Sequence, residues 1–140
     1  MYEYSMLSNQ WTETNTPMTK KRQGHECVKI DKDRILVIGG REGIWNYLKS
    51  TEVYHRIQRK WKTGPMMPKP IEGGQFVKAS PGSKFLGYYI GGDVNGRDSS
   101  AIYGLSKDLS NFQLLGNFKK AREGHVAFRL QESISDKCGD

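Results

Sequence analysis

One polar pair occurs twice in this chain of 140 residues. Arg22 is followed three positions later by His25, and Arg122 is followed three positions later by His125, 100 residues further along. A guanidinium group binds a carboxylate through two parallel hydrogen bonds, and an imidazole changes its charge close to neutral pH. Each pair therefore has two interpretations: contact with an acidic ligand, or a structural role near the start of a strand.

The charge balance favours a negatively charged partner. The chain has 22 Lys and Arg residues against 15 Asp and Glu residues, a net charge of +7. Such a surplus attracts acidic protein segments and nucleic acids alike. We expect an acidic protein segment rather than RNA or DNA, because the net charge is the only feature that supports a nucleic-acid partner. The candidate binding residues, all near predicted strand ends, are Arg22, His25, Arg41, Arg97, Arg122 and His125.

Other site chemistry is poorly represented. His25 and Cys27 are spaced to share a metal, but no second pair has zinc-site spacing and the other His and Cys residues are scattered. No Gly-x-Ser-x-Gly sequence marks a catalytic nucleophile. We therefore expect no catalytic residue, no metal and no cofactor.

The same composition bears on location. Cys27 and Cys138 lie far apart, which argues against a disulfide framework and favours a reducing compartment, so we expect the cytoplasm. The longest aliphatic run covers residues 35–38, far short of the roughly 20 apolar residues that cross a bilayer. We also find no secretory signal pattern at the start, and expect no membrane contact.

The elements that must position these residues repeat with a period near 50. Tyr4 and Trp11 recur as Tyr54 and Trp61, 50 residues later, and Tyr103 is the next tyrosine in this series. Two glycine doublets, Gly39-Gly40 and Gly91-Gly92, are displaced by 52 residues, and each follows an apolar run. Neither doublet leads into a helical pattern, as a phosphate-binding loop would. The repeated residues are therefore interpreted as structural.

Short strands and turns fill each period, with no sustained helical periodicity. Four antiparallel strands per period are predicted, joined by turns and by longer loops at 41–49 and 93–99. The predicted strands cover residues 25–30, 34–39, 51–55, the stretch around Trp61, 75–79, 85–91, 101–105 and 112–115.

An apolar run ending in Gly-Gly, a Tyr and a Trp with six residues between them, and a following Pro-Met resemble the kelch repeat of β-propellers. The resemblance covers roughly residues 1–130 and implies an all-β fold of four-stranded antiparallel blades in an incomplete propeller. It divides the chain into a partial blade (1–24), blades at 25–72 and 73–121, the start of another at 122–130, and a polar tail at 131–140. After Tyr103, Phe112 replaces the expected Trp two residues late.

The resemblance implies a protein-interaction module rather than an enzyme. Members of the family recognise substrates for cullin ubiquitin ligases, and others bind the cytoskeleton or act as scaffolds. The alternatives are a fragment of a galactose-oxidase-like copper enzyme, which needs a Cys, two Tyr and two His at one metal, and a basic nucleic-acid-binding module. Because two and a half blades leave faces and edges uncovered, we expect self-association or a longer parent chain. Partner specificity is expected in loops 41–49 and 93–99.

Overall fold

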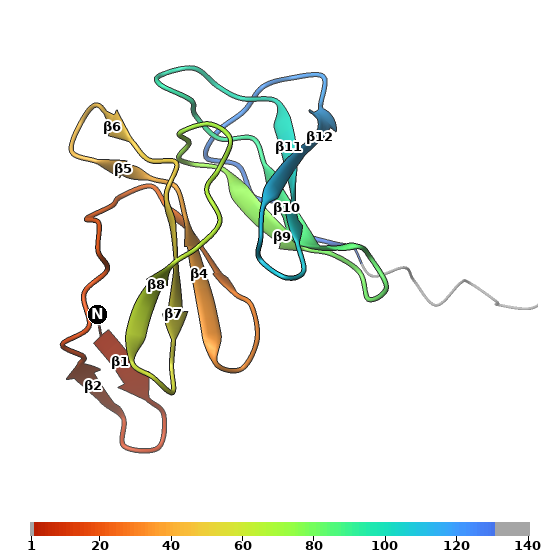
Figure 1. Cartoon of the computed structure of the whole chain (residues 1–140). Coiled ribbons are helices and arrows are strands. Elements are labelled where there is room, and N and C mark those ends of the chain that lie inside the picture. The colour runs from red at the N-terminus through yellow and green to blue at the C-terminus, as the bar shows by residue number, and fades with distance from the viewer. Residues whose placement is uncertain (1, 131–140) are drawn as a thin grey trace, which may run out of the picture.

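A computed structural model describes residues 2–130, and within them every regular element is a strand (Figure 1). The all-β prediction is therefore confirmed, whereas the tail at 131–140 lies outside the described residues. The strands are β1 (Tyr2–Ser5), β2 (Gln10–Glu13), β3 (Glu26–Lys29), β4 (Arg34–Ile38), β5 (Arg41–Glu42), β6 (Asn46–Tyr47), β7 (Thr51–His55), β8 (Lys60–Thr63), β9 (Gln75–Lys78), β10 (Phe85–Ile90), β11 (Ala101–Ser106) and β12 (Phe112–Asn117).

Two four-stranded antiparallel sheets form the body of the molecule. The first sheet has the order β3-β4-β7-β8, and the second has the corresponding order β9-β10-β11-β12. β1 and β2 form a separate hairpin, as do β5 and β6. The two sheets meet where β3 contacts β9, and the described sheets do not close into a ring, as an incomplete propeller requires. The predicted fold class is confirmed.

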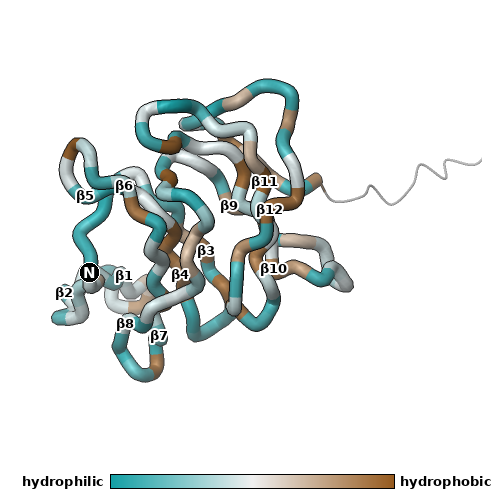
Figure 2. Tube along the Cα trace, turned by 45° about the horizontal axis from the view of Figure 1, so that its top comes forward, coloured by the Kyte–Doolittle hydropathy of each residue, from teal (hydrophilic) through white to brown (hydrophobic). Residues whose placement is uncertain are grey.

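The core lies between the two sheets. Side chains alternate along β4, so Leu36 and Ile38 point towards the second sheet, where Phe76 and Tyr89 complete the cluster. Leu36, Ile38 and Tyr89 have no exposed surface. Hydrophobic stretches of both sheets lie towards the middle of the molecule (Figure 2). Each sheet therefore buries a face only where a neighbouring sheet packs against it.

Both glycine doublets have the same structural role. The N–H of Gly40 donates to the carbonyl of Ile71 at 2.8 Å, and the N–H of Gly92 donates to that of Arg122 at 2.9 Å. A Cβ on Gly39 would lie 2.2 Å from the Ile71 carbonyl oxygen, and both doublets have positive φ. Glycine is required because the segment that begins the next sheet crosses the end of the previous one.

The strand register corrects one expected correspondence. Tyr54 pairs with Trp61 across β7 and β8, and the equivalent pair in the second sheet is Leu105 with Phe112. Phe112 therefore occupies the position equivalent to Trp61. Tyr103, which pairs with Tyr89, is not equivalent to Tyr54, because Leu105 occupies that position. Register irregularities between Phe85 and Gly87 and between Ile102 and Tyr103 shift the spacing within this sheet.

The repeated aromatic pairs differ in burial. The ring centroids of Tyr4 and Trp11 lie 5.1 Å apart, as do those of Tyr54 and Trp61. Tyr54 is buried and Trp61 is half-buried, with its indole N–H donating to the Thr16 carbonyl at 2.9 Å. Trp11 is 70% exposed. The β1–β2 hairpin therefore reproduces the β7–β8 hairpin without the two inner strands that would complete its sheet.

Candidate functional site

The loops after β4 and β10 gather at one end of the two sheets, which we call the loop end (Figure 1). A ladder of backbone hydrogen bonds joins the segments that enter successive sheets. The N–H of Gly73 donates to the Gly24 carbonyl, and the N–H of Gly124 donates to the Gly73 carbonyl, each at 2.9 Å. The ladder brings residues that lie about 50 and 100 positions apart in the chain into one region, including most of the predicted site residues.

Both terminal nitrogens of Arg22 are hydrogen-bonded at the end of the first sheet. One terminal nitrogen, Nη1, donates to the carbonyls of Gly39 and Ser50 at 2.7 and 2.9 Å, and the other, Nη2, donates to Glu52 Oε1 at 2.6 Å. The Arg22 side chain has no exposed surface and that of Glu52 only 3%. In this geometry Arg22 stabilises the end of its own sheet and does not reach a ligand.

Glu52 remains ionised beside Arg22. Burial alone would raise the pKa of Glu52, but hydrogen bonds from Thr19 and Arg22 outweigh burial and hold that pKa below its ordinary value. Thr19 donates both its N–H and its hydroxyl to Glu52 Oε2, at 2.7 and 2.8 Å. The pair therefore also ties down the segment that precedes β3.

Arg41 is partly occupied. Its Nε lies 3.1 Å from Glu72 Oε2, and its Nη1 donates to the Ile44 carbonyl at 3.0 Å. Burial raises the pKa of Glu72, with the nearby carboxylates of Asp93 and Glu123 adding to this effect and Arg41 opposing it. Arg41 thus links the β5–β6 hairpin to the segment that enters the second sheet.

Arg97 and Arg122 are the exposed arginines of the predicted set. The Arg122 guanidinium lies 4.8 Å from the centre of the Phe118 ring, and its Nε donates to the Lys120 carbonyl at 3.4 Å. Arg97 lies in the loop after β10, where its carbonyl accepts the N–H of Val94 at 2.9 Å. These two side chains can meet a carboxylate without breaking an ion pair of the described residues.

The two histidines lie at the seams between successive segments. Burial, and then the charge of Arg22, lowers the pKa of His25, while burial and Arg122 lower that of His125. Both nitrogens of His125 are buried without a hydrogen-bond partner among the described residues, as is Nδ1 of His25. Both imidazoles are therefore neutral at pH 7 and offer no positive charge to an acidic ligand.

Acidic groups also lie at the loop end. Carboxylate oxygens of Asp93, Asp98 and Glu123 approach within 4.8 Å of one another, and this is the cluster of potential metal ligands found in residues 2–130. Sequence reasoning missed it because Glu123 comes from a different segment than Asp93 and Asp98, which lie in the predicted loop 93–99. The cluster lacks the Cys, Tyr and His set that the galactose-oxidase-like alternative needs. It makes the loop end mixed in charge rather than uniformly basic.

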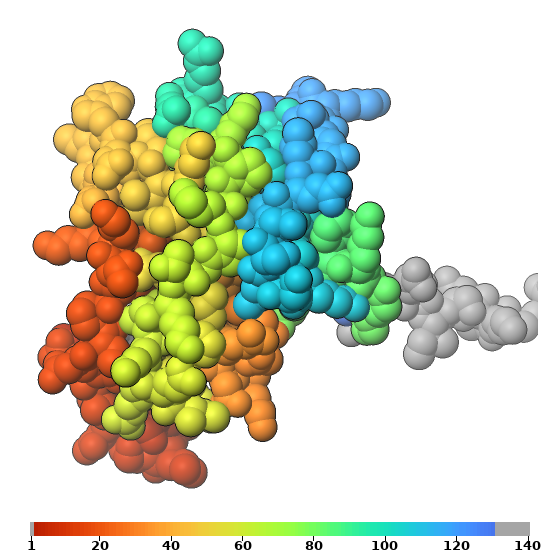
Figure 3. All heavy atoms as spheres, in the orientation of Figure 1, coloured from red at the N-terminus to blue at the C-terminus, as the bar shows by residue number. Residues whose placement is uncertain are grey.

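A projecting apolar tip is the feature of the loop end that packing does not explain. β5 and β6 pair Arg41 with Tyr47 inside the segment predicted as a loop, and the turn between them exposes Ile44 by 67% and Trp45 by 84%. The hairpin stands out from the first sheet (Figures 1 and 3). The second sheet has only an isolated bridge between Asp93 and Asp98 at the equivalent place. Ile44 and Trp45 were not singled out from the sequence, although two adjacent apolar residues inside a predicted loop were the available signal.

Comparison with known families agrees with this geometry. The model of the Kelch motif matches residues 27–68, which contain β3 to β8 except the first residue of β3. Residues 27–68 therefore carry a kelch motif. The chain is also similar to Alpha-scruin of Limulus polyphemus, with 26% identity over 116 residues, 83% of this chain and 12% of that protein. The chain thus spans about one eighth of the length of this curated relative. No helix of residues 2–130 is long and apolar enough to cross a membrane.

Proposed function

We propose that this chain is a protein-binding segment of a kelch-type propeller and that its partner contacts the tip of the β5–β6 hairpin. The observation that carries the proposal is the exposure of Trp45, 84%, beside Ile44 on a hairpin outside the repeated sheets. Tryptophan is enriched among the residues that dominate binding energy at protein interfaces. A large apolar side chain held in water at a loop tip has no role in the folding of either sheet.

The hairpin presents this tip in a defined conformation. Besides the pairing of Arg41 with Tyr47, the Asn46 side chain donates to Glu42 Oε2 at 3.3 Å, and Arg41 holds the Ile44 carbonyl. An ordered loop loses less conformational entropy on binding than a flexible one. The tip is therefore prepared to insert into an apolar pocket of a partner.

Arg97 and Arg122 give the proposal its acidic component. Among the predicted arginines they retain exposed guanidinium groups, whereas Arg22 and Arg41 already face Glu52 and Glu72. We propose that acidic residues of the partner, flanking the apolar contact, meet these two side chains. Arginine suits this role because its planar fork binds carboxylates bidentately.

Site-specific photocrosslinking tests the apolar contact. A photoreactive phenylalanine derivative is placed at Trp45 in cells that make the protein, and in a matched control it is placed at Ile57, which is 76% exposed in the β7–β8 turn. We expect a discrete protein adduct from position 45 and none from position 57. Equal adducts from both positions, or none from position 45, would contradict the proposal. The identity of the adduct distinguishes substrate recognition for a cullin ubiquitin ligase from cytoskeletal or scaffold binding.

Direct titration tests the acidic component. A Glu/Asp-rich peptide and a single-stranded oligonucleotide are titrated at two salt concentrations into the unaltered chain and a variant carrying Arg97→Gln and Arg122→Gln. We expect weak peptide binding that this variant loses and that a control, Arg34→Gln, retains. Tight oligonucleotide binding that weakens steeply with salt, without peptide binding, would favour the nucleic-acid alternative.

A further inference from the structure

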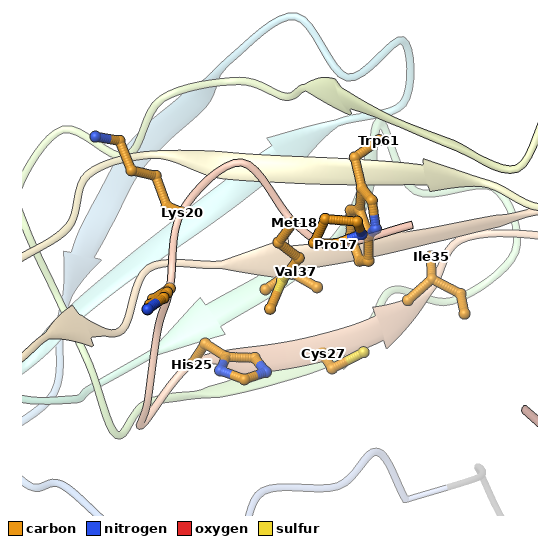
Figure 4. A pocket seen from close by; sticks show the side chains of 9 residues that line it. Pro17, Met18, Lys20, His25, Cys27, Ile35, Val37 and Trp61 are labelled. Atoms are coloured by element: carbon orange, nitrogen blue, oxygen red, sulfur yellow. The ribbon is translucent and has the colours of Figure 1, made fainter. Parts of the chain in front are cut away.

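The first sheet has a hollow on the face that points away from the second sheet (Figure 4). Its volume is about 430 Å³. Val37 and Cys27 form its floor, and Trp61 stands at one edge. The lining residues are Pro17, Met18, Lys20, Lys21, His25, Cys27, Ile35, Val37 and Trp61. The hollow is therefore largely apolar, on a sheet whose other face is already packed.

The register shows what the equivalent face of the second sheet does. Cys27 pairs with Val37 across β3 and β4, and the corresponding pair across β9 and β10 is Phe76 with Tyr89. Phe76 and Tyr89 belong to the core between the sheets, which also includes Ile30 at the end of β3. A further sheet that packed on the first sheet as the first packs on the second would therefore fill this hollow.

The other half of such a contact lies at the opposite end of the molecule. The segment 124–130 rests on the second sheet as the segment 73–79 rests on the first. The Lys78 ammonium group donates to the Ile30 carbonyl at 3.1 Å, and Arg129 Nη1 donates to the Ala79 carbonyl at 3.5 Å. Together with the glycine ladder, this repeated contact identifies 124–130 as the start of the next sheet.

This segment exposes the side chains that would face a further sheet. Val126, Phe128 and Leu130 are 81%, 74% and 78% exposed. Their counterparts 100 positions earlier include Val28, packed against the core, and Ile30, which is 8% exposed. The chain therefore carries both halves of one apolar contact, a hollow at one end and a projecting row at the other, too far apart to meet within one molecule.

We propose that a second copy of this chain fills the hollow, with Val126, Phe128 and Leu130 of one copy packed against Cys27 and Val37 of the other. Because the contact joins different surfaces of the two copies, it is head-to-tail, and its repetition gives a finite assembly only when it closes into a ring. Each copy supplies three sheet positions: the partial sheet of β1 and β2, which segment 124–130 of the next copy extends, and two complete sheets. Closed propellers have about 4–8 blades, so two copies, giving six, satisfy this range, whereas one or three copies do not.

Sedimentation analysis across a concentration series tests this assembly. We expect the unaltered chain to sediment as a dimer at micromolar concentration, and Phe128→Glu to raise the dissociation constant at least about tenfold. Phe128 is exposed in the single copy, so circular dichroism should show that the variant remains folded. The matched control, Ile57→Glu, alters a residue that is 76% exposed in the β7–β8 turn and should leave the dimer intact. A monomer at every concentration, or a Phe128→Glu variant that dimerises normally, would overturn the proposal.

Alkylation of Cys27 examines the other side of the contact. In a Cys138→Ser background Cys27 is the remaining thiol, and the structure leaves it free and exposed. We expect slower reaction with a maleimide as protein concentration rises through the dissociation constant, and no dimer after complete modification. A reaction rate independent of concentration, or a dimer of the modified chain, would contradict the proposed contact. Neither readout depends on the partner of the β5–β6 hairpin, so the two proposals can fail separately.

Discussion

Replacing Glu52 by Gln should destabilise the chain by about 3 kcal/mol, at the lower end of the range for breaking a buried ion pair. The estimate follows from burial and hydrogen bonding: the Arg22 side chain has no exposed surface, and its Nη2 lies 2.6 Å from Glu52 Oε1. The amide keeps one accepting oxygen but turns an NH2 group towards a donor, either from Arg22 or from Thr19. A buried guanidinium group is then left without its counter-charge.

Urea denaturation, followed by tryptophan fluorescence at one fixed protein concentration, measures the free energy of unfolding. The matched control is Arg56→Gln, which breaks the ion pair to Asp33 but alters a side chain that is 63% exposed. Surface pairs contribute about 0–1 kcal/mol, so the control should change the free energy of unfolding by no more than this. If Glu52→Gln lowers it no further than the control does, the structural role assigned to Arg22 is wrong.

Acid titration gives a second check on the same pair. The pKa of Glu52 lies below its ordinary 4.5 in the folded chain, so an unfolded chain takes up the proton first as pH falls. The stabilisation from this carboxylate is therefore complete above about pH 4.5 and decreases as pH falls through the lowered folded-state pKa. Glu52→Gln should remove this component of acid sensitivity. An unchanged slope of stability against pH in this range would contradict the assignment.

Three further predictions concern the packing of the sheets. Trp61→Ala should cost about 2–4 kcal/mol in urea denaturation, somewhat less than the roughly 3–5 kcal/mol of a fully buried aromatic truncation, because the ring is half-buried. Trp11→Ala, at a residue 70% exposed, should cost less than about 1 kcal/mol, and equal losses would contradict the burial difference. Gly74→Ala places a Cβ 2.4 Å from a buried tyrosine ring and should cost about 1–3 kcal/mol, whereas Gly116→Ala meets nothing within 4 Å and should be nearly neutral in thermal unfolding. His125 has a pKa below 6.5 when folded, so its contribution to stability falls as pH decreases below about 6.5, and His125→Gln should flatten the stability profile there; an unaltered profile would place the pH sensitivity elsewhere.

The architecture could be predicted because local chemistry repeats. Each apolar run followed by a glycine doublet produced a strand and a close crossing of the next segment, as at Gly40 and Gly92. The strand register was harder to predict, because a fixed offset in sequence identifies structurally equivalent residues only where both sheets are regular. The irregularities beside Gly87 and Tyr103 therefore moved the expected place of the second aromatic pair. The β5–β6 hairpin was missed because its strands are two residues long and carry no alternation.

The site residues were harder still, since repetition of Arg22 as Arg122 does not reveal what each side chain meets. Glu52 lies 30 positions from Arg22, and the contact exists only because β7 pairs with β4 and brings its carboxylate to the loop end. The counterpart of Glu52 in the second sheet is Tyr103, so the ion pair is not repeated there. The exposure of Trp45 depends on the direction of one hairpin, which composition does not determine.

The affinity of the crosslinked partner for three forms of the chain tests the proposed function most directly. Titration calorimetry compares the unaltered protein, Trp45→Ala, and Ile57→Ala as the matched exposed control. We predict that Trp45→Ala weakens binding at least about tenfold, that Ile57→Ala changes it little, and that both variants unfold at the same temperature as the unaltered chain. Equal affinity of all three forms would contradict a protein-binding role for the β5–β6 hairpin.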